Sequence, residues 1–295
     1  MAFRLSGPDD AGRRLRQGFV GELTRLRRLV TSPAGPSAAR RDDTVHEVRK
    51  SLKRLRAMLR LLRDVLGEAE YRRENLALRD TARPLAEVRD AKVFIGTIEA
   101  LARRRSPRGT VARQLAHLRE GLVAHHRALA ERVLGTDRAL EATATVLAAV
   151  GARAERWPLP QHRGWSLLKP GFERTYRRGR RAWTRARRKG TSEALHEWRK
   201  EVKYLLYQLQ IVEPAWGASE RALARRLDRL ADLLGEDHDL AVVRTIVSDP
   251  VVDRLISARR TALQRQAFAL GGRVYQAPTA ARLRSLRSGW KRWHA

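Results

Sequence analysis

The sequence contains one short motif twice, and this repeat constrains the fold more than any other feature. The first copy begins at His46 and reads His-Glu-Val-Arg-Lys-Ser-Leu-Lys; the second begins at His196 and reads His-Glu-Trp-Arg-Lys-Glu-Val-Lys, an offset of 150 residues (196 − 46). Arg89-Asp90 follows the first copy and His238-Asp239 the second, after gaps of 44 and 43 residues (90 − 46 and 239 − 196). Two motifs repeated in register predict a tandem repeat of one structural unit.

Helical periodicity runs through almost the whole chain. Apolar residues recur every three or four positions, alternating strand patterns are missing, and Pro and Gly clusters separate the periodic segments. We therefore predict an all-α protein. The expected helices cover 9–30, 43–66, 69–81, 84–105, 110–134, 137–156, 170–188, 191–213, 218–234, 236–247, 250–270 and 278–292.

Two prolines in the segment Trp157-Pro158-Leu159-Pro160 interrupt the helical period near the middle of the chain. This break divides the sequence into comparable parts. We predict a single domain over 1–295, built of a first helical repeat over 9–157 and a second over 165–290. Halves this similar are expected to pack about a pseudo-twofold axis.

The repeated helix carries an apolar stripe and a cationic stripe. Apolar residues step by three and four from Val45 to Leu66, and again from Leu195 to Val212. This spacing is typical of a helix that packs in a bundle. At 100° per residue, the cationic residues lie about a third of a turn around from that seam. The cationic stripes are His46, Arg49, Lys50 and Lys53 in the first copy, and His196, Arg199, Lys200 and Lys203 in the second.

A solvated surface is the ordinary explanation of a charged stripe, but the use of lysine favours a functional one. The chain has 62 Lys and Arg residues, of which only eight are Lys, and four of those eight occupy equivalent places in the two repeats. A general preference for Arg does not explain that distribution. Each His is also expected in a first helical turn, because capping side chains precede both copies. These are Asp42, Asp43, Thr44, Thr191 and Ser192.

The formal net charge of +30 predicts a polyanionic partner, because such an excess repels a compact fold unless something neutralises it. The absence of Cys excludes disulfides and thiolate metal sites and suits a reducing cytoplasm. The segment from Met1 to Asp10 does not read as a signal peptide, and no apolar stretch approaches a membrane span. We expect a protein without a membrane partner.

The pattern His-x-x-Arg-Lys-x-x-Lys, present twice and followed by Arg-Asp or His-Asp, resembles the CHAD domain, the "conserved histidine α-helical domain", over nearly the whole chain. The resemblance implies two four-helix bundles with a basic channel between them that binds inorganic polyphosphate, no catalytic activity, no cofactor, and a place at cytoplasmic polyphosphate granules. Arg89 stands where the second copy has His238, so strict symmetry is not expected there. The polyphosphate-binding residues implied are His46, Arg49, Lys50, Lys53, Arg54, Arg89, Arg177, Arg178, Arg181, His196, Arg199, Lys200, Lys203, Tyr204 and His238, with Asp90 and Asp239 in support.

The two motif histidines have a predicted role in proton exchange. We hypothesise that surrounding cations lower the pKa of His46 and His196, so that both are neutral in an empty site and gain protons when phosphate binds. The alternative is that each His caps its helix or fills a gap in the core.

An enzymatic interpretation begins from His238-Asp239, because helical HD-type phosphohydrolases use a His-Asp pair to hold a metal. The surrounding Arg and Lys residues would repel a divalent cation. His46-Glu47 and His196-Glu197 also match the start of a zincin motif, but Lys50 and Lys200 stand where its second His belongs. We expect neither a metal site nor catalysis.

Nucleic-acid binding is the stronger alternative, because the charge excess would also release counterions from DNA or RNA. The seven Trp residues are scattered at helix ends and seams, which predicts packing rather than a base-stacking platform. The adjacent His125 and His126 point to different helix faces and are predicted to serve packing or the surface. We expect weak, non-specific nucleic-acid binding beside the main polyanion site.

Overall fold

The computed structural model describes residues 3–32, 38–105, 109–160, 164–247 and 249–294. All regular elements in these ranges are helical, which confirms the all-α fold class. The elements up to the central break are α1 (Ala11–Thr31), α2 (Ala38–Leu66), α3 (Glu68–Arg105), α4 (Thr110–Ala130), the π-helical turn η1 (Glu131–Thr136) and α5 (Ala139–Ala154). The later ones are α6 (Gly164–Lys189), α7 (Ser192–Ile211), the 3-10 turn η2 (Glu213–Ala215), α8 (Ala218–Arg244), α9 (Pro250–Tyr275) and α10 (Thr279–His294).

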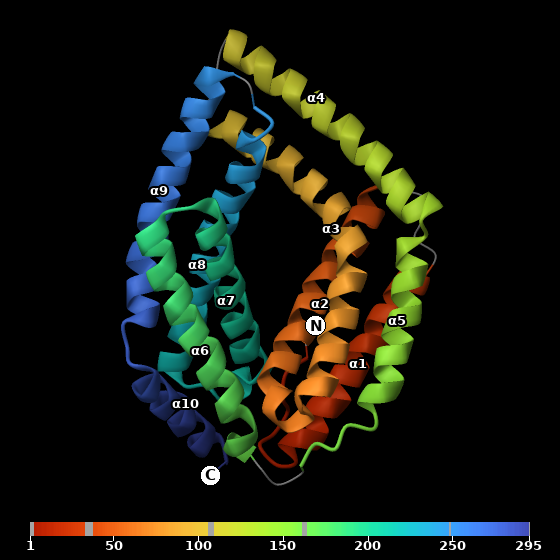
Figure 1. The fold of residues 1–295 in the computed structure, drawn as a ribbon, viewed down its shortest axis with the longest axis vertical. Coiled ribbons are helices and arrows are strands. Elements are labelled where there is room, and N and C mark those ends of the chain that lie inside the picture. Colours follow the sequence, from red (N-terminus) through yellow and green to blue (C-terminus); the bar gives the residue numbers. More distant parts are fainter. Residues whose placement is uncertain (1–2, 33–37, 106–108, 161–163, 248, 295) are drawn as a thin grey trace.

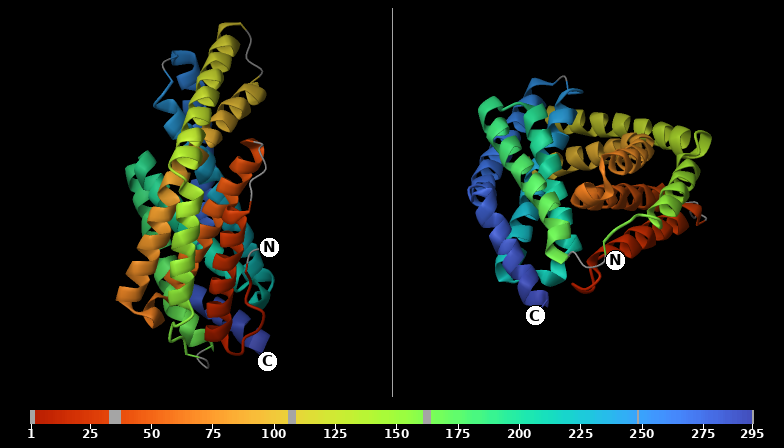
Figure 2. Two further views of the ribbon diagram at one scale, coloured as in Figure 1. Left: turned by 90° about the vertical axis from the view of Figure 1, so that its right-hand side faces the viewer. Right: turned by 60° about the horizontal axis from the view of Figure 1, so that its bottom comes forward.

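The helices form two groups that follow the chain order. Helices α1 to α5 pack mainly on one another, as do α6 to α10. Figures 1 and 2 show the two groups side by side, with α4 crossing over one end of the molecule toward α9. Between the groups, α2 packs against α6 and α7, and α3 contacts α8. The two repeated helices, α2 and α7, therefore touch each other at the junction of the halves.

The apolar seams of α2 and α7 are buried as the sequence predicts. Every seam residue is at most 5 % exposed. Burial of a large aliphatic side chain contributes about 1.5–3 kcal/mol, so these two stripes anchor both halves. The seam residues are Val45, Val48, Leu52, Leu55, Leu59, Leu62 and Leu66 in α2, and Leu195, Trp198, Val202, Leu205, Leu209 and Val212 in and just after α7.

The structure corrects the predicted break before Pro84. Helix α3 runs unbroken from Glu68 to Arg105 with Pro84 inside it. Proline removes one backbone hydrogen bond and distorts the helix. Leu78 before it and Leu85 after it are fully buried in one core, so packing carries the helix through the proline. Figure 1 shows α3 bending from its first part beside α2 toward the α8 and α9 end of the molecule.

Two further predicted boundaries are wrong for related reasons. Helix α8 continues through Gly235, where a break was expected, because Leu234 and Leu240 on either side are buried. Helix α6 begins at Gly164 rather than at Pro170, because Leu168 and neighbouring residues already pack into the core. The break between the repeats is confirmed over 155–160, which are not helical; 161–163 lie outside the described residues.

The capping prediction is correct for α7 and wrong for α2. Thr191 is the N-cap of α7, and its side chain accepts a hydrogen bond from the Ala194 backbone N–H at 3.2 Å. Helix α2 instead begins at Ala38, so Asp42 lies inside it and His46 falls in its third turn. The Asp42 carboxylate binds side chains of α3 and α4 rather than the helix end.

Gly171 allows the two halves to meet backbone to backbone. A Cβ added at Gly171 in α6 would lie 2.3 Å from the backbone oxygen of Leu61 in α2. A larger residue would have to push the helices apart, which typically costs about 1–3 kcal/mol in a packed core. The close contact therefore fixes α6 relative to α2. Because α7 packs on α6, the position of α7 is fixed as well.

Two predictions are confirmed: the Trp residues serve packing, and His125 and His126 point to different faces of their helix. Trp157, Trp198, Trp216 and Trp290 are at most 2 % exposed, and the other three Trp residues pack partly buried against the core. His126 is buried and its neighbour His125 is exposed, so the two do face different directions.

Candidate functional site

Helices α2 and α3 of the first half hold Arg49 in a fixed position. Its guanidinium donates a hydrogen bond to the backbone oxygen of Leu85 at 3.2 Å and forms an ion pair with Asp90 at 3.4 Å. Burial lowers the pKa of Arg49, while Asp90 opposes that effect and the nearby Arg89 and Arg199 add to it. The influence of Arg199, from α7, places the equivalent arginines of the two repeats within electrostatic reach of each other.

Lys53 and Lys203 extend this cluster by one helical turn on each side. Burial, followed by Arg49, Arg199 and Lys203, lowers the pKa of Lys53 to about 8, while Asp90 acts in the opposite direction. The side chain of Lys53 is nevertheless exposed. Burial and Arg199 likewise lower the pKa of Lys203.

The motif histidines differ between the halves. His196 on α7 lies against His238 on α8, with ring centroids 4.2 Å apart. Burial, followed by His238 and Arg199, lowers the pKa of His196 to about 4. His46 is exposed, and its pKa is lowered by partial burial and then by Arg89. The predicted direction is correct for both residues, but desolvation, which penalises the charged ring, is the first cause and nearby cations the second.

The two motif aspartates approach the same cluster. Burial, together with the nearby carboxylate of Asp90, raises the pKa of Asp239 to about 6, while Arg199 and Arg89 oppose this rise. Asp239 on α8 and Asp90 on α3 come from opposite halves. The centre therefore holds two carboxylates among more numerous cations, and one of these carboxylates is easily protonated.

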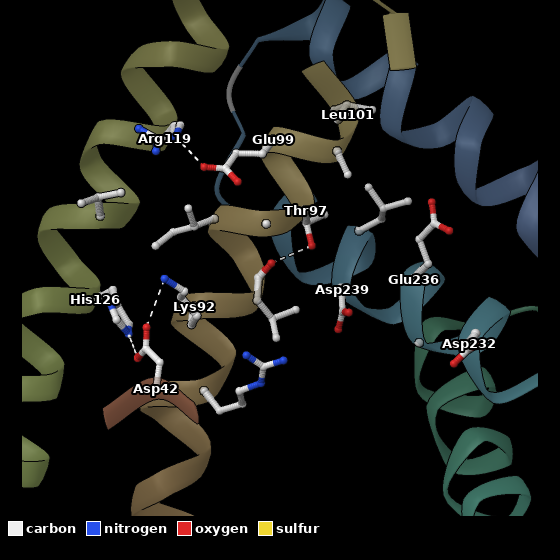
Figure 3. Close-up of a pocket in the computed structure, with 18 of the residues that line it drawn as sticks. Asp42, Lys92, Thr97, Glu99, Leu101, Arg119, His126, Asp232, Glu236 and Asp239 are labelled. Carbon is white, nitrogen blue, oxygen red and sulfur yellow. Dashed lines mark hydrogen bonds and ion pairs between the residues drawn. The ribbon is translucent and has the colours of Figure 1, made fainter. Parts of the chain in front are cut away.

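A cavity of about 910 Å³ lies beside the cluster and is lined by helices of both halves. Figure 3 shows it between α3 and α4 on one side and α8 and α9 on the other. Arg89, Arg199, Lys203 and Asp239 are the predicted site residues that line it. Its walls also carry Asp232 and other carboxylates, so the cavity is of mixed charge rather than uniformly basic.

One wall of this cavity holds a charged triad that the sequence did not predict. The Asp42 carboxylate lies 2.9 Å from Nε2 of the buried His126 and 3.1 Å from Nζ of Lys92. Figure 3 shows the three side chains converging from α2, α3 and α4. This triad connects the first turns of α2 to α3 and α4, which line the cavity.

Arg199, on α7, packs against α8 at Gly235. A Cβ added at Gly235 would lie 3.4 Å from two guanidinium nitrogens of Arg199, which is the short end of an ordinary van der Waals contact. The glycine that suggested a helix break in the sequence therefore lies inside α8, directly beside the Arg199 guanidinium.

Several predicted site residues lie at the edge of this cluster. Lys200 forms an ion pair with Glu197 on its own helix, and Lys50 lowers the pKa of His46. Arg54 lies over the ring of Tyr207, and Tyr204 lies under Arg60, at 5.7 and 4.0 Å. The last two contacts join α2 to α7, so Arg54 and Tyr204 serve the junction of the halves.

The three predicted residues of α6 have their contacts elsewhere. Arg177 pairs with Glu173 on its own helix, and Arg178 binds Glu201 on α7 at 2.8 Å. Arg181 lines a separate shallow hollow on α6 together with Trp183. These contacts do not connect the three arginines to the central cluster, and their part in binding stays a prediction.

Sequence reasoning missed other residues that line the cavity. Lys92 is one helical turn beyond Arg89 and is one of only eight lysines, a signal that could have found it. Asp232 and Glu236 precede Asp239 at helical spacing, which also indicates one face of α8. The remaining missed cations are Arg119, Arg127 and Arg259.

The described part of the chain is all-helical, and α2 and α7, which carry the two copies of the motif, bring Arg49, Lys53, Arg199 and Lys203 within electrostatic reach of one another. In the described part of the chain, no three His, Asp or Glu side chains are grouped so that they could hold a metal ion. None of its described helices combines the length and the apolar character that a membrane span requires.

Comparison with known proteins assigns this architecture to a family. The model of the CHAD domain matches residues 24–248, so the chain belongs to the CHAD family. The crystal structure of the CHAD domain from the plant Ricinus communis is similar, with a TM-score of 0.56 and 18 % sequence identity. That match covers 99 % of this chain and 96 % of the plant chain. A search of curated proteins finds no match.

Proposed function

We propose that the protein binds inorganic polyphosphate at the junction of its two halves. The observation that carries the proposal is the mutual effect of four cations, Arg49 and Lys53 from the first repeat and Arg199 and Lys203 from the second. Each of these lysines has a lowered pKa, so holding its charge in the empty site is unfavourable. Burial is the first cause, and repulsion among the cations adds to it. A polyanion bound among the cations offsets both effects, and binding is therefore favourable.

The chemistry of the cluster suits a phosphate chain. Arginine grips two phosphate oxygens with its planar fork, whereas lysine acts as a mobile point charge. Polyphosphate has no bases, so its binder gains nothing from stacking platforms. The described Trp residues are packed in or against the core, which fits this requirement. The family resemblance implies the same ligand.

The contacts between the halves support pseudo-twofold symmetry with a central channel. Helices α2 and α7 carry the two copies of the motif, and these equivalent helices touch. The next equivalent pairs, α3 with α8 and α4 with α9, also touch. Contact between equivalent elements is what a twofold axis produces. In the proposed arrangement the axis passes through the cation cluster, and the channel continues from the cavity.

The surroundings of His238-Asp239 argue for binding without catalysis. His238 lies against His196, and Arg199 and Lys53 both lower the pKa of His238 after burial has done so. Such cations would repel a divalent metal from this pair. We propose a non-catalytic recruitment module that works at polyphosphate granules in the cytoplasm.

Competition between polyanions tests this function against nucleic-acid binding. Fluorescently labelled long-chain polyphosphate is bound to the full chain at near-physiological salt, and unlabelled polyphosphate or duplex DNA is added at matched phosphate concentration. The proposal predicts displacement by polyphosphate at much lower concentration than by DNA. Equal displacement would contradict it, because counterion release alone would then explain the binding.

A further inference from the structure

We propose that the outer surface formed by α6 and α9 binds a nucleoside triphosphate, with the base in one hollow and the phosphates in an adjoining one. The two hollows have volumes of about 400 and 420 Å³, and Trp183 of α6 lines both. Each volume lies in the range of about 300–1,000 Å³ that is typical of small-molecule sites. Among the described residues, the hollows share no lining residue with the cavity beside the central cluster, so the inference does not rest on the proposed function.

The first hollow lies between α6 and α9, which pack side by side (Figure 1), and it has an aromatic and apolar floor. A Cβ added at Gly272 would lie 3.9 Å from a ring carbon of Trp183, which is an ordinary contact distance, so the missing side chain leaves space in this hollow. A flat, mainly apolar group such as a nucleobase suits a floor of this kind. The floor residues are Trp183 on α6 and Phe268, Ala269 and Gly272 on α9.

Trp183 presents a stacking surface at the junction of the two hollows. Its ring stacks on Tyr275 at a centroid distance of 6.5 Å, and the guanidinium of Arg187 lies 5.1 Å from its centroid. Bases stack on aromatic rings and on guanidinium planes alike. The exposed Gln276 lines the first hollow, and its amide can both donate and accept a hydrogen bond at the edge of a base.

The second hollow is lined mainly by arginines. Arg181, Arg185 and Arg188 are exposed and follow one another after four and three residues (185 − 181 and 188 − 185), so they lie on one face of α6. Within the part of the chain that the structure describes, none of these three side chains has an ion pair or a hydrogen bond. Their charges repel one another, and a triphosphate among them offsets this repulsion while each guanidinium grips phosphate oxygens.

One base hollow beside one phosphate hollow favours a mononucleotide over other anionic partners. Polyphosphate has no base to place in the first hollow, and a nucleic-acid strand would require stacking surfaces for successive bases. An anionic membrane would require exposed apolar side chains. The exposed large apolar residues of the described chain are Leu76, Ile246 and Val251, and none of them lines either hollow.

Photolabelling with 8-azido-ATP locates the site without any added polyphosphate. The full chain is labelled at near-physiological salt, and the modified peptides are identified by mass spectrometry. We expect the label on the peptides of α6 and α9 around Trp183 and Phe268. Unlabelled ATP should prevent labelling at a concentration at least about tenfold lower than adenosine or tripolyphosphate, because only ATP fills both hollows. A label confined to α2 and α7, or equal protection by tripolyphosphate and ATP, would overturn the proposal.

A double arginine variant tests the phosphate hollow. At subsaturating 8-azido-ATP, Arg185→Gln with Arg188→Gln should reduce labelling of α6 and α9 at least about tenfold, because two charged hydrogen-bond donors are lost. The matched control, Arg284→Gln with Arg287→Gln, removes two exposed arginines of α10 and should reduce labelling less than about twofold. Equal losses in both proteins would mean that net charge alone attracts ATP, and the assigned hollow would be wrong.

A glycine variant tests the base hollow. Gly272→Leu should fill the space beside Trp183 and reduce labelling at least about fivefold. Gly21→Leu on α1, where an added Cβ meets no described atom within 4 Å, is the control and should leave labelling unchanged. Circular dichroism checks that both variants fold. Full labelling of a folded Gly272→Leu protein would contradict the position of the base.

A single-stranded RNA oligonucleotide distinguishes a mononucleotide site from a strand-binding surface. The proposal predicts that RNA protects α6 and α9 from labelling no better than ATP at matched phosphate concentration. Much stronger protection by RNA would make a strand the occupant and would contradict the proposal. A failure of polyphosphate to bind at α2 and α7 would contradict the proposed function and leave this labelling as predicted, so the two proposals fail separately.

Discussion

The two copies of the repeated motif occupy different environments. In the second half His196 is partly buried against His238, and its pKa falls to about 4. In the first half the equivalent His46 is exposed, and Arg89 stands where the second half has a histidine. Asp239 is partly buried with a raised pKa, while its equivalent Asp90 is exposed and paired with Arg49. Sequence identity of the motif therefore does not produce identical chemistry.

Both halves supply cations to the cluster, but the titrating groups with strongly shifted pKa values lie in one half. Arg49 and Lys53 of the first copy lie within electrostatic reach of Arg199 and Lys203 of the second, so charge comes from both halves. The motif residues with the largest shifts, His196 with a pKa of about 4 and Asp239 with a pKa of about 6, both belong to the second half. Binding strength should thus depend on both halves, and its pH dependence in acid mainly on one.

Removing the central arginines should have the largest effect. The double variant Arg49→Gln with Arg199→Gln should weaken polyphosphate binding at least about a hundredfold, because hydrogen bonds to charged groups contribute about 1.5–3 kcal/mol each. Fluorescence anisotropy measures the affinity, and circular dichroism checks that the helices persist. The matched control, Lys50→Gln with Lys200→Gln, changes edge residues and should cost about tenfold at most. If the control variant weakens binding as much as the double arginine variant does, the ligand binds at Lys50 and Lys200 rather than at the central arginines.

Single lysine variants test whether the halves contribute equally. Lys53→Ala and Lys203→Ala should each weaken binding about tenfold, and each should reduce the salt dependence of the affinity by about one counterion. Titrations at several salt concentrations measure both quantities. If only one of the two variants weakens binding, the ligand lies on one half and the shared centre is wrong.

Proton uptake should distinguish the two histidines. At pH 6 His196 is neutral in the empty protein, and a bound polyanion raises its pKa, so binding takes up as much as about one proton. Affinity then falls as pH rises through the raised pKa. Calorimetry in buffers of different ionisation enthalpy measures this uptake. The variant His196→Gln should lose most of the proton uptake, and His46→Gln should lose little of it. The reverse order would contradict the difference between the two halves.

Asp239 should give the smallest effect. Above pH 6 its carboxylate is ionised and repels phosphate, so Asp239→Asn should tighten binding about twofold to fivefold at pH 7.5. Below pH 5 the wild-type carboxyl is already protonated, and the two proteins should bind alike. Asp253→Asn, which changes an outer ion pair with Arg244, is the control and should have no effect. A gain that persists unchanged at pH 5 would contradict the raised pKa of Asp239.

The sequence predicts those features that depend on local pattern. The periodic seams of α2 and α7 and the proline break between the repeats needed no knowledge of neighbouring helices. The helix breaks predicted at Pro84 and Gly235 are wrong because long-range packing overrides the local preference of proline and glycine. Each lies inside a helix whose flanking leucines are buried.

From the sequence, only those residues of the candidate site that belong to the repeated motif could be predicted. Arg49, Lys53, Arg199 and Lys203 were found from the repeat, and the structure brings them together. The triad around Asp42 could not be found, because its members are 50 and 34 residues apart (92 − 42 and 126 − 92) and meet only in the fold. The α6 arginines were expected in the site because the family resemblance implied them; in the structure Arg177 pairs with Glu173 and Arg178 with Glu201.

A structure of the full chain with bound polyphosphate tests the central claim most directly. The account predicts phosphates between α2 and α7, with Arg49 and Arg199 each in contact with the same chain of phosphates. Phosphates bound only along the outer face of α6, around Arg181, would contradict it.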